Sequence, residues 1–358
     1  MKILDWYILK RYLLTFILML VLFIPIGITI NLAEKIDKML ANEVPAGEII
    51  QYYLDFTVYF ANLLLPLFLF LSVIWFTSKL ANNTEVIAFI SSGVSFYRFL
   101  RPYIIGASLV AAIALFLGMY LAPKASQGYN EFEYKYLKGG RKDKETSNIY
   151  RQINDNEIIF VSNFNTKDRR GSNFTLEHFE GNTLKYKISA LNIIYNPADS
   201  TYRLTNYTKR IIGPERDTII NRRRVDTTFT FDMEDLTPVK YIAETLNYNE
   251  LTRFINKETE RGSSYIGRYQ VVKFKKWSIP VSVFILTIIA VSVSSKKRRG
   301  GMGVNLALGI LIAMIYIFFD KVFGVMAEQS DMPPFFAVWF PNLLFGTLAA
   351  YLLYNAKR

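Results

Sequence analysis

The chain has 358 residues, 51% of them hydrophobic and 20% charged, and its formal net charge is +12. It has no cysteine and a single histidine, His178, which excludes disulfides, thiolate metal sites and cysteine nucleophiles and leaves little for a histidine-based triad. The basic residues lie in loops beside hydrophobic blocks and are not gathered on one soluble module, so we expect a membrane as partner and no nucleic acid.

Six windows of the chain contain no Asp, Glu, Lys or Arg. About 20 apolar residues in a helix span the roughly 30 Å hydrocarbon core, where one central charge costs about 2.5–3.5 kcal/mol. We therefore predict six transmembrane helices, over residues 12–33, 56–77, 102–122, 277–295, 300–319 and 332–356. The first window is too long for the apolar part of a signal peptide and lacks a convincing cleavage site, so we interpret it as retained.

The loop charges predict an orientation. Basic residues fill the termini and the loops after the second and fourth windows: Lys2, Lys10, Arg11, Lys79, Arg98, Arg101, Lys296, Lys297, Arg298, Arg299, Lys357 and Arg358. The loop after the fifth window is mainly acidic, with Asp320, Lys321, Glu328 and Asp331. Because basic loops stay inside, we predict that both termini are cytoplasmic and that the long segment between the third and fourth windows is periplasmic.

That segment predicts an inserted all-β domain. Residues 124–144 are polar and are expected to extend the third helix, and residues 249–260 are expected to be helical. Between them, short alternating stretches separated by turn residues predict a sandwich or jelly roll, with strands over residues 156–164, 174–179, 183–196, 201–212 and 225–232. The fold class is thus six transmembrane helices plus a jellyroll-like domain, with boundaries at 1–123, 124–270 and 271–358.

Two charged features each leave two interpretations open. The triplet Arg222, Arg223 and Arg224 is either an anion-binding site or a solvated strand end. Asp320 and Lys321, just beyond the fifth window, are either a local ion pair or simple interfacial anchors.

Motifs of nucleotide binding and catalysis are absent from the sequence. It contains no G-x-x-x-x-G-K-[ST], G-x-G-x-x-G, G-x-S-x-G or H-E-x-x-H pattern, so we expect no cofactor and no catalytic activity. The windows also lack the ionisable residues that proton- or sodium-coupled carriers use. If the protein transports a substrate, its energy comes from elsewhere.

The loop after the second window predicts a short helix at about residues 82–93. Residues 82–84 can cap it, Glu85 lies in its first turn, and Ser92 and Gly93 end it. Its apolar residues are Val86, Ile87, Phe89 and Ile90. Such a helix either docks into the groove of a partner or rests on the membrane surface.

Four stretches then resemble one family. They are 84–102 (TEVIAFISSGVSFYRFLRP), 273–301 (KFKKWSIPVSVFILTIIAVSVSSKKRRGG), 331–345 (DMPPFFAVWFPNLLF) and 4–16 (LDWYILKRYLLTF). In order and spacing they resemble the LptF/LptG (YjgP/YjgQ) permeases, the membrane subunits of the lipopolysaccharide export ABC transporter. The resemblance covers essentially the whole chain.

The resemblance implies a mechanism and partners. A heterodimer of two such paralogues would form a cavity in the bacterial inner membrane, cytoplasmic ATPase subunits would bind the ATP, and periplasmic bridge proteins of the LptC/LptA type would receive lipopolysaccharide. The contacts to the ATPase would come from the short helix, through Glu85, Val86, Phe89, Ser92 and Gly93.

The resemblance also implies contacts to lipid phosphates. Lys35, Lys38 and, more weakly, Lys124 lie at the outer ends of helices one and three. The alternative is that they anchor these helices at the interface, since Glu34 and Asp37 lie beside the first two. For the whole chain, the alternative function is a membrane sensor or scaffold whose β-domain binds a ligand.

Overall fold

The computed structural model describes residues 3–138, 146–165, 168–196, 199–229, 231, 241–263, 265–297, 300–329 and 332–356. Among the residues used for orientation, Lys2, Arg298, Arg299, Asp331, Lys357 and Arg358 lie outside these ranges. The chain divides into two compact units. The helical unit comprises Met1–Arg141, Ala243–Asn249 and Gly267–Arg358, and the β unit comprises Lys142–Ile242 and Glu250–Ile266.

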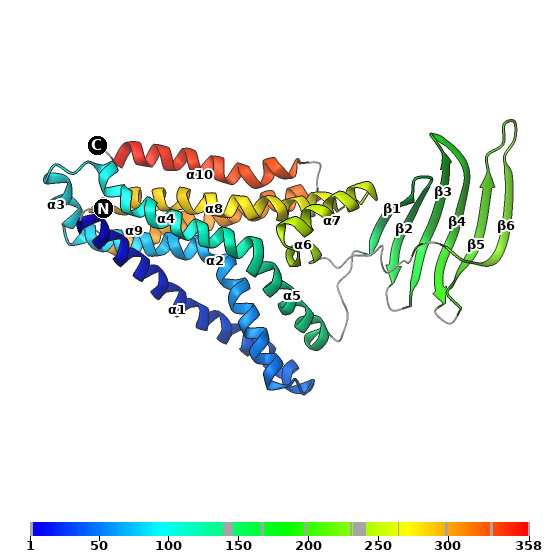
Figure 1. Ribbon diagram of the computed structural model, residues 1–358, viewed down its shortest axis with the longest axis horizontal. Coiled ribbons are helices and arrows are strands. Elements are labelled where there is room, and N and C mark those ends of the chain that lie inside the picture. The colour runs from blue at the N-terminus through cyan, green and yellow to red at the C-terminus, as the bar shows by residue number, and fades with distance from the viewer. Residues whose placement is uncertain are drawn as a thin grey trace. The chain divides into compact units, whose positions relative to one another are not determined.

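Within the described ranges, six helices are long and apolar enough to cross a membrane, as predicted. They are α1 (Ile3–Ala41), α2 (Ala46–Asn82), a continuous helix formed by α4 (Phe96–Phe116), η1 (Leu117–Leu121), α5 (Ala122–Phe132) and η2 (Glu133–Leu137), α8 (Ile266–Ser294), α9 (Gly301–Gln329) and α10 (Pro334–Ala356). Shorter helices are α3 (Glu85–Ser91), α6 (Ile242–Thr245) and α7 (Tyr248–Glu260). The start of α1, the end of α10 and α3 lie at the same end of the helical unit (Figure 1).

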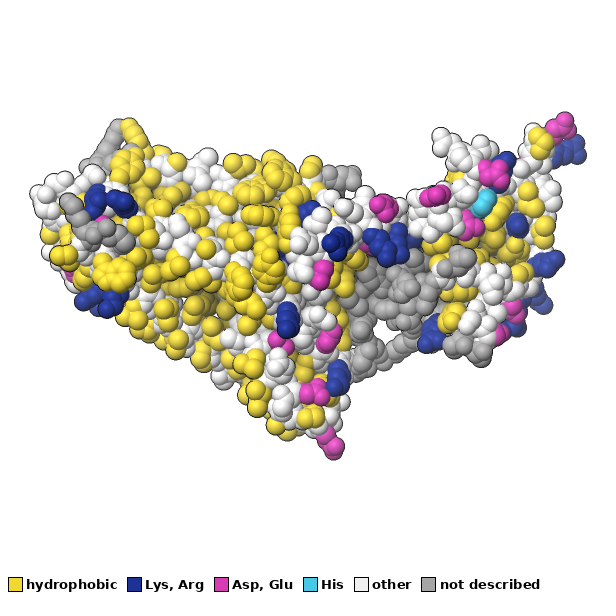
Figure 2. Space-filling model, viewed as in Figure 1, with side chains coloured by type: hydrophobic (Ala, Val, Ile, Leu, Met, Phe, Trp, Pro, Cys, Tyr) yellow, Lys and Arg dark blue, Asp and Glu magenta, His cyan; other side chains and the backbone are white. Residues whose placement is uncertain are grey.

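The surface of the helical unit suits a bilayer. Figure 2 shows a broad hydrophobic band between two ends where charged side chains gather. On α1 the band includes the exposed residues Leu14, Ile17, Leu18, Val21, Leu22, Ile26 and Ile30. Exposed apolar side chains in such numbers would be unfavourable in water and are expected where lipid is the solvent.

The core of the helical unit is built mainly from α2, α4 and α8, against which α1 packs through aromatic residues. Tyr12 of α1 stacks on Tyr103 of α4, with ring centroids 5.5 Å apart. A Cβ atom at Gly106 would lie 2.2 Å from the hydroxyl of Tyr12. Only glycine at position 106 therefore lets α1 approach α4 this closely.

Polar contacts join the last three spans. Asn342 of α10 donates to the hydroxyl of Ser278 on α8 at 2.9 Å and accepts from Tyr316 of α9 at 3.1 Å. Asp320 of α9 pairs with Lys275 of α8 at 2.9 Å. Asp320 is thus in an ion pair, but its partner comes from another helix and is not the adjacent Lys321.

The third span keeps its helical course beyond the membrane window, which confirms the expected extension of helix three. It contains two π-helical turns, η1 and η2, and each carries wider, less regular hydrogen bonding than an α-helix. The ammonium of Lys276 on α8 is buried and donates to the carbonyl of Gly118 in η1 at 2.8 Å. A carbonyl in a π-turn thereby gains a charged partner from the neighbouring helix.

The β unit contains one antiparallel sheet of six described strands, which confirms the inserted all-β domain. The strands follow chain order: β1 (Ser147–Asn154), β2 (Glu157–Asn165), β3 (Arg170–Glu180), β4 (Thr183–Asn196), β5 (Thr201–Ile211) and β6 (Thr218–Thr227) (Figure 1). The four inner strands match the predicted ones closely. Strand β1 was not predicted, and β6 lies earlier than predicted, because edge strands need not carry an alternating apolar pattern.

A row of kinks crosses this sheet. Asn148, Asn173 and Asn206, on β1, β3 and β5, all have left-handed backbone angles, with φ of 51°, 52° and 52°. Regular pairing is interrupted at each of them. Side-chain alternation switches there, so Gly171 and Phe174 are both buried on the core face of β3.

The basic triplet lies on the exposed edge strand β6. Arg224 and Arg203 both pair with Asp226 at 3.1 Å, and their hydrogen bonds lower the pKa of that carboxyl. Arg224 of the triplet thus shares a carboxylate within the sheet with Arg203, and all three arginines of the triplet are exposed.

A buried ion pair attaches α7 to the other edge of the sheet. Arg151 of β1 and Glu258 of α7 are 1% and 3% exposed, and their charged atoms are 3.1 Å apart. The amide of Gln152 also donates to the carbonyl of Arg261 at 2.8 Å, which occupies part of the free edge of β1. The pair is imperfect, since Arg151 Nε and Glu258 Oε2 lack a well-aligned hydrogen bond.

We predict that Glu258→Gln destabilises the β unit, since removing one partner of a buried pair costs about 3–5 kcal/mol. The double change Arg151→Met with Glu258→Leu should recover most of that loss, because it leaves no buried charge. Limited proteolysis of the purified full chain measures both. Equal protease resistance of Glu258→Gln and the wild type would contradict the prediction.

Candidate functional site

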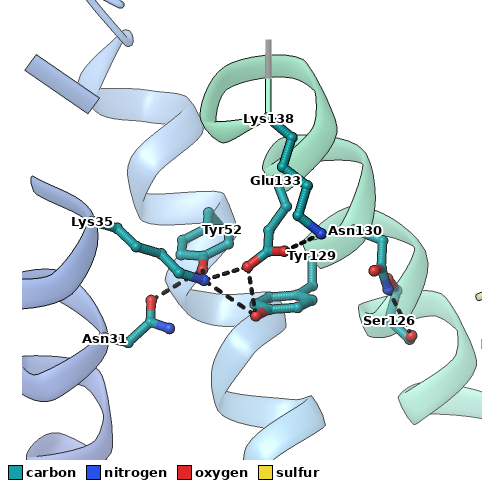
Figure 3. A network of polar contacts seen from close by, with 8 residues as sticks. All are labelled: Asn31, Lys35, Tyr52, Ser126, Tyr129, Asn130, Glu133 and Lys138. Atoms are coloured by element: carbon teal, nitrogen blue, oxygen red, sulfur yellow. Dashed lines mark hydrogen bonds and ion pairs between the residues drawn. The ribbon is translucent and has the colours of Figure 1, made fainter. Parts of the chain in front are cut away.

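Two groups of polar side chains lie at opposite ends of the helical unit. The first surrounds α3, at the end that carries the start of α1 and the end of α10 (Figure 1). The second joins α1, α2 and the segment α5–η2, which we call the outer arm (residues 122–137) (Figure 3). Each group contains residues that the sequence marked as candidates.

The helix α3 forms where it was predicted, but its start differs. Thr84 has φ of 63° and makes no side-chain cap, so the expected cap from residues 82–84 is wrong in that respect. The end matches the expectation. The amides of Gly93 and Val94 donate to the carbonyls of Ile90 and Phe89 at 3.0 and 3.3 Å, and Gly93 has φ of 82°. This is a Schellman motif, which favours glycine at that position.

The apolar residues of α3 divide between two faces. Val86 is 1% exposed and, with the half-buried Phe89, packs into the core of the helical unit. Ile87 and Ile90 point away and are 51% and 44% exposed. Val86 and Phe89 therefore hold the helix in place, whereas Ile87 and Ile90 offer an apolar surface. Ser92 and Gly93 are exposed next to it.

Glu85 is linked to α1. One oxygen of its carboxylate accepts from the hydroxyl of Tyr7 at 3.1 Å, and the other accepts from Asn83 at 3.3 Å. The guanidinium of Arg11 lies over the ring of Tyr7, 4.7 Å from its centroid. The carboxylate of candidate Glu85 thus already connects the start of α3 to the first helix.

A second contact joins α1 to α4. Asp5 of α1 is buried and pairs with Arg98 of α4 at 2.9 Å. Asp5 and Tyr7 were not candidates in the sequence, where Asp5 looks like one acid in a helix start. Only the packing of α1 against α3 and α4 reveals the two links.

Lys35 is the centre of the group at the opposite end (Figure 3). Its ammonium pairs with Glu133 of the outer arm and donates to the hydroxyls of Tyr52 at 3.0 Å and Tyr129 at 3.3 Å. Tyr129 donates to Glu133 at 2.8 Å, and Tyr52 donates to Asn31 at 3.0 Å. Lys35 is therefore held among three helices, with 16% of its side chain exposed.

The other two lysine candidates are more accessible. Lys38, nearly one turn beyond Lys35, is exposed. Lys124 is exposed on the outer arm and lies within electrostatic reach of Asp55 on α2. A Cβ atom at Gly128 would lie 2.2 Å from a carboxylate oxygen of Asp55, so the arm packs directly against α2. Lys124 does not belong to the cluster around Lys35.

Contacts between helices join, in pairs, the four stretches on which the resemblance rests. Asp5 and Tyr7, from residues 4–16, meet Arg98 and Glu85, from residues 84–102. Similarly, Ser278 from residues 273–301 bonds Asn342 from residues 331–345 (2.9 Å).

Comparison with known sequences gives the family. The profile described as lipopolysaccharide export system permease LptF/LptG matches residues 6–355. The chain belongs to this family. No curated protein sequence matches it significantly. As an LptF/LptG permease, it is a transport subunit without catalytic activity of its own.

The link between Asp5 and Arg98 gives a prediction for this LptF/LptG permease. Asp5→Arg should lower the melting temperature of the purified protein, because it places two cations together where Asp5 is buried. The loss should be smaller than for the same change in a fully buried pair, since Arg98 is partly exposed.

The matched control for Asp5→Arg is the exchanged pair. Asp5→Arg combined with Arg98→Asp restores opposite charges and should recover stability, as followed by thermal melting in detergent. A double variant no more stable than Asp5→Arg would show that the contact between the two charges contributes nothing.

Proposed function

We propose that this permease is one of two membrane subunits of an ABC transporter that extracts lipopolysaccharide from the bacterial inner membrane. The observation that carries the proposal is the family match over residues 6–355. In this account a paralogous permease completes the lipid cavity, and periplasmic bridge proteins of the LptC/LptA type receive the lipid. Separate cytoplasmic ATPase subunits bind the ATP in this proposal, so this chain needs neither an ATP site nor a cofactor of its own.

In the proposed orientation, the end that carries α3 faces the cytoplasm and the β unit faces the periplasm. The basic residues near α3 support it, among them Lys10, Arg11, Lys79, Arg98 and Arg101. Basic residues at membrane helix ends favour the cytoplasmic side. The mixed charges around Glu133 at the opposite end fit the outer side, where no such bias operates.

The proposed docking site for the ATPase is the outward surface of α3. Ile87 and Ile90 are large, apolar and exposed at a helix that Val86 holds in place. Glu85 starts that helix and can pair with a base of the partner through the carboxylate lone pairs that Tyr7 and Asn83 leave free. A short, rigidly seated helix of this kind suits a groove in a soluble partner.

A membrane sensor or scaffold is the alternative function. It would share the six spans and the β unit, but it would not need an ATPase at α3. Purification of the chain under mild conditions separates the two functions: a permease brings down a cytoplasmic ATPase and a second, different six-span chain, whereas a sensor brings down neither.

We predict that Ile87→Asp with Ile90→Asp abolishes co-purification of the ATPase while the permease remains folded. Both side chains are exposed, so the substitutions should cost the isolated chain little, but they place two charges in an apolar interface. Co-purification followed by ATPase assay of the complex is the measurement.

The control places the same substitutions on exposed apolar residues at the opposite end. Leu40→Asp with Ile50→Asp changes residues that are 69% and 63% exposed at the ends of α1 and α2 near their connection. This variant should retain the ATPase. Full retention of the ATPase by the α3 variant would place the docking surface elsewhere.

A further inference from the structure

Lys35 uses all of its hydrogen-bonding capacity within the chain. A lysine ammonium has three donor hydrogens. Three acceptors surround it: the carboxylate of Glu133 and the hydroxyls of Tyr52 and Tyr129. In this arrangement a lipid phosphate can reach Lys35 only by replacing one of them.

Glu133 is the acceptor that a phosphate can replace. It is an anion among donors, since it pairs with Lys35, accepts from Tyr129 at 2.8 Å and lies 3.4 Å from the ammonium of Lys138. Only 12% of its side chain is exposed. Two lysines and a tyrosine hydroxyl around a carboxylate form an anion site, and its occupant belongs to the chain itself.

The outer arm begins directly after one π-turn, η1, and ends with the other, η2, which carries Glu133. The inner turn, η1, is fixed to α8 by the bond from Lys276 to the carbonyl of Gly118. The other polar contacts of the arm with α1 and α2 include the pair between Lys135 and Glu48, whose side chains are 60% and 43% exposed. Exposed pairs of this kind contribute little. The contact between Lys35 and Glu133 is therefore the main charged link between α1 and the arm. It acts beside the apolar cluster of Met39, Tyr52 and Phe132 and the bond from the Asn42 amide to the carbonyl of Tyr136 at 2.9 Å.

We propose that Glu133 is a resident anion, that a phosphate of lipopolysaccharide displaces it from Lys35, and that this exchange breaks the charged link and loosens the contact between the outer arm and α1. The inference rests on the proposed function, and it adds a specific residue and an order of events. Lys38, exposed nearly one turn away, makes the first contact with the phosphate. The exchange then couples capture of the lipid to a change in the contacts of the arm.

The test uses the assembled transporter in nanodiscs of phosphatidylethanolamine with a small fraction of lipopolysaccharide. A photo-reactive amino acid replaces Glu34, which is exposed one turn before Lys38 on α1. Glu133→Gln keeps the shape of the side chain and removes its charge. We expect it to increase lipopolysaccharide crosslinking severalfold over the wild type, because Lys35 no longer has an anion of its own.

Matched variants give the controls. Glu131→Gln changes an exposed acid of the same helix, which accepts from Gln127 at 2.9 Å, and should leave crosslinking unchanged. Lys35→Gln should lower crosslinking. Glu133→Asp retains an anion and should remain close to the wild type, so it distinguishes loss of charge from loss of folding.

Two further lipids identify the source of the anion. When lipopolysaccharide without its lipid A phosphates is used, Glu133→Gln should not increase crosslinking over the wild type. When phosphatidylglycerol replaces lipopolysaccharide, the increase in crosslinking should be smaller. A gain that persists without the phosphates would overturn the exchange.

The outcomes also separate this inference from the proposed function. Suppose that the wild type crosslinks lipopolysaccharide, but crosslinking of Glu133→Gln does not exceed that of the wild type or is lowered as in Lys35→Gln. The proposed function then stands and the exchange is wrong. If neither the wild type nor any variant crosslinks lipopolysaccharide, the proposed function fails and the exchange fails with it.

Discussion

A polar group without a partner costs several kcal/mol in hydrocarbon, and this constraint determines where the helical unit can carry charge. Several of its charged side chains next to the spans are accordingly found in contacts between helices. Lys275 pairs with Asp320, Lys276 bonds the carbonyl of Gly118, and Asp5 pairs with Arg98. Because the same contacts connect particular helices, they also decide which helices are held together.

The first helix shows this most clearly. Its middle is largely exposed apolar surface, whereas each end carries a charged contact to another element. At one end Asp5 and Tyr7 connect it to α4 and α3, and at the other Lys35 connects it to the outer arm. At 39 residues, α1 is long enough to link the proposed ATPase surface to the proposed lipid site. The same helix therefore carries the contacts to both proposed surfaces.

The sequence was sufficient for the features that depend on local pattern. The six spans follow from windows without charge, the end of α3 follows from Ser92 and Gly93, and the inner strands follow from alternation. The resemblance to LptF/LptG permeases also came from the order of four stretches, and the family match over residues 6–355 confirms it.

The features that were missed depend on which elements become neighbours. Nothing local distinguishes Glu133 from Glu131, yet one pairs with Lys35 and the other is exposed. Likewise, Asp320 was expected to find a partner, if any, next to it in sequence, and it found Lys275 on another helix. Strand β1 was missed because Arg151 breaks its apolar pattern, and the ion pair with Glu258 of α7 that accompanies the burial of this arginine is not visible in the sequence.

The central claim is that lipopolysaccharide displaces Glu133 from Lys35 and so loosens the outer arm from α1. Because the chain has no cysteine, two introduced cysteines can carry spin labels without further changes. Labels at Asp37 of α1 and Gln127 of the arm, both exposed, report the distance between the two elements in the assembled transporter. The account predicts one short distance without lipopolysaccharide and a second, longer population when it is added. A distance distribution that lipopolysaccharide leaves unchanged would contradict it.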